Sequence, residues 1–130
     1  MANILKILVV EDEDLVRKVM LKLLERLGYS GLGVTDGAQA LFQSREMADK
    51  GEAFAVAIID ANLPDGLVGV DVAMALRRSN PQLKTILTSG DLSKAVSSRH
   101  KLWDGFLAKP FEMEGLKKVL SEVLAEPSTP

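Results

Sequence analysis

The sequence ILKILVVEDED, residues 4–14, joins an apolar run to four consecutive acidic residues. The apolar part, residues 4–10, is rich in leucine and β-branched residues, which is typical of a short strand buried in a parallel sheet. It is far too short to span a membrane, which takes about 20 apolar residues. The sequence therefore predicts a buried first strand that carries acid at its carboxyl end.

The alternation of apolar strands and amphipathic helices continues along the rest of the chain. The first helix is expected at residues 14–27, where apolar residues recur at helical spacing and Gly28 ends the pattern. Further strands are expected at residues 29–34, 54–59, 84–88 and 105–108, and further helices at residues 36–50, 70–78, 92–102 and 113–124. Five strands alternating with five helices predict a doubly wound, flavodoxin-like α/β fold with a parallel sheet covered on both faces.

Length and composition favour a single domain in a protein of the reducing cytosol. The 130 residues are 47% hydrophobic, enough for a single core, and residues 1–125 are expected to form it, with 126–130 as a linker-like tail. A formal charge of −2 gives no positive field for nucleic acid or anionic lipid. The absence of cysteine excludes disulfides and thiolate chemistry. We expect a cytoplasmic protein with no direct contact to nucleic acid or membrane.

Side chains that can bind a cation or take part in a reaction follow four of the predicted strands. Glu11 and Asp12 follow the first strand, Asp60 the third, Ser89 the fourth and Lys109 the fifth. In open α/β sheets, ligands bind beyond the carboxyl ends of the strands, so these side chains are expected to converge. Carboxylates brought together repel one another unless a cation neutralises them, and Mg²⁺ suits such oxygen ligands. No histidine lies near these positions, which argues against zinc.

Taken singly, these pieces have ordinary structural explanations. The acidic run could be a solvated helix start with Asp14 as N-cap, and Asp60 could begin a turn. Taken together and in order, ILVVEDED, the strand ending in Asp60 with LP following, TSG and KPF resemble the receiver domain of response regulators. The resemblance implies that Asp60 accepts a phosphoryl group from a phosphohistidine of a sensor histidine kinase or phosphotransfer domain. It also implies a downstream effector protein and no enzymatic activity beyond the chain's own phosphorylation and dephosphorylation.

The resemblance further assigns roles at the site. The metal ligands would be Asp12, which binds Mg²⁺ directly, Asp60, Glu11, which acts mainly through a coordinated water, and the carbonyl of Asn62. Ser89 would donate its hydroxyl to a phosphoryl oxygen. Lys109 would pair with the phosphoryl group or, before transfer, with Asp60.

Three positions would control the response to phosphorylation. Phe106 occupies the place of the switch aromatic on the fifth strand and lacks the hydroxyl of the tyrosine often found there, so it can act only by packing. Asn62 and Asp91 hold the two positions that tune the lifetime of the phosphoryl group in this family. An amide beside an acid can position a water for attack on the acyl phosphate, which predicts a short-lived phosphorylated state.

Alternatives to an active receiver remain open. A haloacid-dehalogenase-type phosphatase usually has a second aspartate where this chain has Asn62. A flavodoxin-like electron carrier would need a phosphate-binding loop after the first strand, where EDED would repel the flavin phosphate. A degenerate receiver that only binds proteins is the third alternative. The loop after Asp60 also contains one residue more than is usual in the family, and the interval from Ser89 to Lys109 is slightly short.

Overall fold

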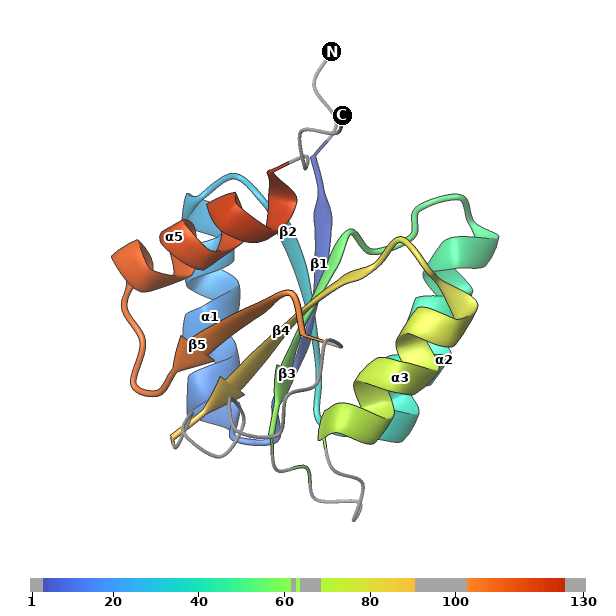
Figure 1. The fold of residues 1–130 in the computed structure, drawn as a ribbon, viewed down its shortest axis with the longest axis horizontal. Helices are drawn as coiled ribbons and strands as arrows, with labels where there is room; N and C mark the ends of the chain where they lie inside the picture. The colour runs from blue at the N-terminus through green and yellow to red at the C-terminus, as the bar shows by residue number, and fades with distance from the viewer. Residues whose placement is uncertain (1–3, 62, 64–68, 91–102, 126–130) are drawn as a thin grey trace.

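The computed structural model describes residues 4–61, 63, 69–90 and 103–125. Its core is one parallel sheet in the order β2-β1-β3-β4-β5, with α1 and α5 on one side and α2 and α3 on the other (Figure 1). The strands are β1 (Lys6–Val10), β2 (Ser30–Val34), β3 (Val56–Asp60), β4 (Lys84–Ser89) and β5 (Gly105–Ala108). The helices are α1 (Asp14–Arg26), α2 (Gly37–Asp49), α3 (Gly69–Ser79) and α5 (Met113–Leu124). The predicted doubly wound, flavodoxin-like fold is confirmed; the helix predicted at 92–102 and the tail at 126–130 lie outside the described residues.

The order of the strands brings the ends of β1 and β3 together. β1 pairs with β2 on one side and with β3 on the other, and Val10 lies opposite Ile59 in the register. The chain leaves β1 toward the edge of the sheet and then returns to add β3, so the strand order reverses between these two strands. Ligands bind at such a switch point in open α/β sheets. Residues that follow Val10 therefore lie beside the end of β3.

The sheet separates two layers of apolar side chains. Leu8 and Val10 of β1 belong to the cluster that includes residues of α2 and α3, whereas Ile7 and Val9 belong to the cluster that includes residues of α1 and α5. This explains why β1 is apolar at successive positions rather than at alternate ones. Trp103 is only 8% exposed and packs in the first cluster.

The weakly apolar edge strand β2 is explained by the helix that packs on it. A Cβ atom on Gly31 would lie 2.8 Å from Cδ2 of Leu21, and one on Gly33 would lie 2.9 Å from Cδ of Arg17. Such distances are too short for carbon atoms in contact, so α1 approaches β2 as closely as it does because β2 has no side chain at these positions. Glycine costs strand stability but permits this close approach.

The helices α1 and α2 begin in different ways. The N-cap of α1 is Glu13, not Asp14 as the ordinary structural explanation of the acidic run would have it. Asp14 is the first helical residue, and its charge lies in the first turn, where the helix dipole favours an anion. Asp36 caps α2 by accepting a hydrogen bond at 2.9 Å from the backbone N–H of Gln39. Among the described residues, no helix is both long enough and apolar enough to cross a membrane.

Replacement of Asp36 by alanine is expected to lower the free energy of unfolding by about 1 kcal/mol, because the first turn of α2 loses its side-chain acceptor. Chemical denaturation measures this change. Glu112→Ala is the matched control, since Glu112 is the N-cap of α5 but its side chain makes no capping hydrogen bond. Equal destabilisation by the two substitutions would contradict the assigned role of Asp36.

Candidate functional site

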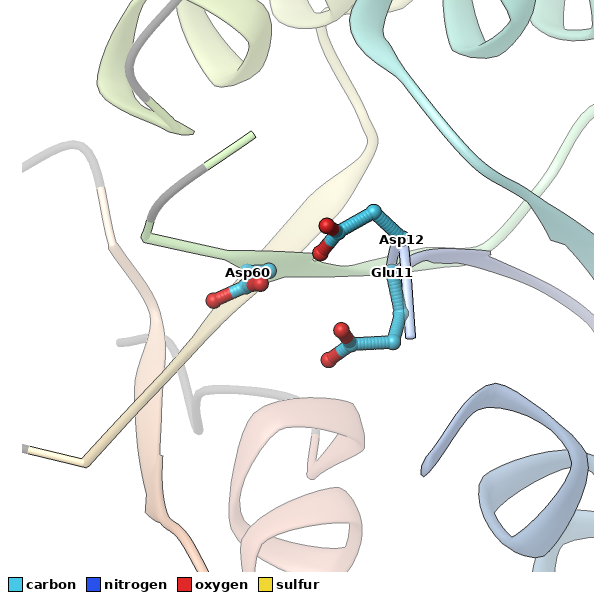
Figure 2. Close-up of side chains that lie close together, drawn as sticks. All are labelled: Glu11, Asp12 and Asp60. Atoms are coloured by element: carbon cyan, nitrogen blue, oxygen red, sulfur yellow. The ribbon is translucent and has the colours of Figure 1, made fainter. Parts of the chain in front are cut away.

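Three carboxylates meet where β1 and β3 end. Glu11 and Asp12 directly follow β1, and Asp60 is the last residue of β3. One oxygen from each carboxylate lies within 4.8 Å of the others, and Figure 2 shows the three side chains together at the strand ends. Glu11 and Asp60 are buried, with 3% and 6% of their surface exposed, whereas Asp12 is exposed. The acidic cluster is thus covered on the sheet side and open to solvent at Asp12.

Lys109 places a positive charge against this cluster. Its Nζ lies 2.8 Å from Oε1 of Glu11 and 3.4 Å from Oδ1 of Asp60. The backbone N–H of Lys109 donates to the carbonyl of Ser89 at 2.9 Å, which ties the end of β5 to that of β4. Burial alone would lower the pKa of Lys109, but its hydrogen bond to Glu11 and the charges of Asp60 and Glu11 outweigh burial and raise that pKa. The ammonium group therefore neutralises part of the crowded negative charge.

This raised pKa predicts how stability depends on pH in the absence of metal. A lysine whose pKa is higher in the folded chain than in the unfolded chain stabilises the fold while it is charged. This stabilisation is complete below the unfolded pKa of about 10.4 and is lost as the pH rises through the pKa of the folded chain. We expect the difference in unfolding temperature between the wild type and Lys109→Met to stay constant near neutral pH and to shrink in strong alkali. Thermal unfolding in a chelating buffer tests this. A difference that grew with pH would contradict the assignment.

The donor set fits a hard divalent cation. It consists of carboxylate oxygens from Glu11, Asp12 and Asp60, and such oxygens are the atoms that Mg²⁺ prefers in proteins. Glu11 is further fixed because its Oε2 accepts a hydrogen bond at 3.1 Å from the N–H of Glu13. An acidic triad of this kind is typical of a Mg²⁺ site, as the sequence predicted.

The other predicted site residues are placed as follows. Ser89 ends β4 and is 8% exposed, one position beyond Thr88, which lies opposite Asp60 in the register. Phe106 lies in β5, is partly buried and packs against the core cluster on the α2 and α3 side. Asn62 and Asp91 lie outside the described residues, so their roles remain predictions.

Two residues at the site were not foreseen from the sequence. Arg17 of α1 donates from Nη1 to the backbone carbonyl of Glu11 at 3.0 Å. Gly69, the first residue of α3, donates its N–H to the carbonyl of Ala61 at 3.1 Å, and a Cβ atom there would lie 2.7 Å from the carbonyl oxygen of Asp60. Both act on the backbone of the acidic residues. The only sequence signals were a basic residue one turn after the acidic run and a glycine ending the loop after Asp60.

Comparison with known proteins identifies the family of the chain. The family model of the response regulator receiver domain matches residues 7–121. The chain is 30% identical over 122 residues to the sensor protein TorS of Escherichia coli, covering 92% of this chain and 13% of TorS. It is 29% identical over 125 residues to the chemotaxis protein CheY1 of Helicobacter pylori, covering 92% of this chain and 97% of CheY1. The chain thus spans a small part of the sensor protein and nearly all of the chemotaxis protein.

Solved structures of two related proteins have the same fold as this chain. The chemotaxis protein CheY4 of Vibrio cholerae superposes with a TM-score of 0.83 at 27% identity, covering 94% of this chain and 100% of CheY4. The response regulator TrrA of Thermotoga maritima, solved in complex with Mg²⁺ and BeF, superposes with a TM-score of 0.79 at 25% identity, covering 93% of this chain and 100% of TrrA. Because the family model covers most of the sequence and the acidic cluster lies at the ends of β1 and β3, the chain belongs to the response regulator receiver domain family.

Proposed function

We propose that Asp60 is the phosphoacceptor of this receiver domain and that its phosphorylation requires Mg²⁺ and Lys109. The observation that carries the proposal is the meeting of three carboxylates within 4.8 Å, with the ammonium of Lys109 between Glu11 and Asp60. Among these carboxylates, Asp60 is the one at the end of the strand that lies in the middle of the sheet. Strands β1 and β4 flank β3, and Asp60 lies opposite Thr88 of β4, so its backbone is held in place, which a nucleophile that must be positioned requires.

The reaction is a transfer of one phosphoryl group. A carboxylate oxygen of Asp60 attacks the phosphorus, the bond from phosphorus to the donor atom breaks, and its electron pair leaves with the donor. The donor atom is an imidazole nitrogen when the donor is a phosphohistidine. The product on the receiver is an acyl phosphate of Asp60. Lys109 lies 3.4 Å from Oδ1 of Asp60 and can follow the charge onto the phosphoryl oxygens.

Mg²⁺ would be held directly by Asp12, by Asp60, mainly through a water by Glu11, and by the carbonyl of Asn62. When bound, it supplies positive charge to the phosphoryl oxygens. The Ser89 hydroxyl would donate to one of the same oxygens. Its place at the end of β4, directly beyond the residue opposite Asp60, supports this role.

The response would pass through Phe106 to the surface around β5 and α5. Phe106 packs against the core cluster that contains Leu87 of β4, so a rearrangement at Ser89 can reach it through the sheet. Asp91 would shorten the life of the acyl phosphate together with Asn62. Similarity to a sensor protein, a sensor kinase and a chemotaxis protein supports a sensor histidine kinase or phosphotransfer domain as donor and a protein as target. We propose that this exchange takes place in the cytoplasm.

The test is the intact mass of the chain after incubation with acetyl phosphate, with and without Mg²⁺. A single phosphoryl adduct is expected only with Mg²⁺, and it should be labile in alkali, as an acyl phosphate is. Asp60→Asn should give no adduct. An adduct on the Asp60→Asn variant, or none on the wild type even with Mg²⁺, would overturn the proposal; the second result would leave a receiver that works by protein binding alone.

A further inference from the structure

Arg17 folds back from α1 onto the acidic run that precedes the helix. Its Nη1 donates to the backbone oxygen of Glu11 at 3.0 Å and lies 3.5 Å from that of Asp12. Its Nη2 pairs with the carboxylate of Asp14. Although charged, the Arg17 side chain is only 15% exposed. One planar guanidinium thus contacts three of the four residues of the acidic run, a geometry that its forked donors permit.

The stem of Arg17 is held in turn by the edge strand. A Cβ atom on Gly33 would lie 2.9 Å from Cδ and 3.0 Å from Cγ of Arg17, so the side chain crosses β2 where β2 has no side chain. The next residue, Val34, accepts a hydrogen bond at 3.0 Å from the N–H of Glu11. β2 therefore fixes the start of the acidic run directly and also the arginine that binds it.

We infer that Arg17 is a positioning residue of the metal site, which holds the carbonyls of Glu11 and Asp12 so that the carboxylates of these residues face Asp60. This inference rests on the proposed function. The described contacts of Arg17 go to backbone oxygens and to Asp14, so it acts through the backbone and not as a ligand. Arg17 would contact the residues that bind the metal rather than the metal itself and would keep them in place. Loss of such a contact typically lowers metal affinity by about 10- to 100-fold.

Charge and positioning predict opposite results when Arg17 is replaced. A guanidinium near a cation site repels the cation, so removing its charge should by itself strengthen Mg²⁺ binding. Loss of the fixed backbone should weaken it. A weaker affinity in a variant that has lost a positive charge would therefore identify positioning as the dominant effect.

The experiment is a Mg²⁺ titration of the full chain followed by amide NMR shifts, which also report whether each variant is folded. Arg17→Met and Arg17→Lys are both expected to lower Mg²⁺ affinity by roughly 10-fold, since lysine keeps the charge but not the fork. Lys18→Met is the matched control, because Lys18 is the exposed neighbour of Arg17 on the same helix. It should bind Mg²⁺ as well as the wild type or slightly better.

A second variant tests the same idea from the other element. Gly33→Ala changes no charge but places a methyl group against the stem of Arg17, and it should also weaken Mg²⁺ binding. Arg17 variants that bind Mg²⁺ like the wild type, even with a lower unfolding temperature, would overturn the inference and leave the proposed function intact. A wild-type chain that binds no Mg²⁺ would overturn both.

Discussion

Lys109→Met is expected to slow phosphorylation of Asp60 by about 100-fold or more while strengthening Mg²⁺ binding. The ammonium contacts Glu11 and Asp60 at 2.8 and 3.4 Å, where it neutralises the carboxylates that a metal ion would also neutralise. Without it, the cluster keeps its full negative charge and attracts the cation more strongly. The transferring phosphoryl group, however, loses a cation that would stabilise its oxygens.

Phosphorylation rates with acetyl phosphate and Mg²⁺ titrations of the same samples measure the two effects separately. Lys118→Met on the exposed side of α5 removes an equal charge away from the cluster and should change neither quantity appreciably. A Lys109→Met variant that lost Mg²⁺ affinity along with its rate would show that the lysine supports the metal site rather than the transfer.

Gly69→Ala is expected to reduce the phosphorylation rate by about 100-fold, the size of effect that a displacement of about 1 Å at a reacting group can have. The added methyl group would lie 2.7 Å from the carbonyl oxygen of Asp60 and 3.3 Å from Cα of Ala61. Both are backbone atoms, which cannot rotate away as a flexible side chain can. Either the end of β3 or the start of α3 must therefore shift, and Asp60 moves relative to Asp12 and Lys109.

Gly115→Ala is the matched control for this prediction. A Cβ atom on Gly115 would meet only Cδ1 of Leu107 at 3.6 Å, an ordinary contact, inside α5. Alanine there should raise the free energy of unfolding by about 0.5 to 1 kcal/mol and leave phosphorylation unchanged. If Gly69→Ala also reacted at the wild-type rate, the close approach of Gly69 to the backbone of Asp60 would not be needed for phosphorylation.

The meeting of Glu11, Asp12, Asp60 and Lys109 could be predicted from sequence because parallel strands present their carboxyl ends at one edge. Each of these residues follows or ends an apolar strand, and the order of strands and helices predicts the sheet. No distance between side chains was needed. The same argument explains why an acid cluster and a single lysine were enough to predict a cation site.

The finer arrangement depends on contacts that no periodic pattern encodes. The resemblance to receiver domains implied that Lys109 pairs with Asp60 before transfer. Lys109 does contact Asp60, yet its shorter contact is with Glu11, whose side chain is one methylene longer than that of aspartate. The roles of Arg17 and Gly69 depend on backbone carbonyls, which every residue has. Such contacts depend on how closely α1 and α3 approach the sheet, and the packing of side chains between helix and sheet sets this distance.

The division of β1 between two apolar layers has a consequence for how this strand can vary. Ile7 and Leu8 are adjacent in the chain but pack in different clusters, whereas Leu8 and Val10 share one. Non-additive effects of double substitutions arise among residues that share a packing environment. Adjacent residues of β1 should therefore vary independently of each other. A change at Leu8 would be compensated by substitutions in α2 or α3, and a change at Ile7 by substitutions in α1 or α5.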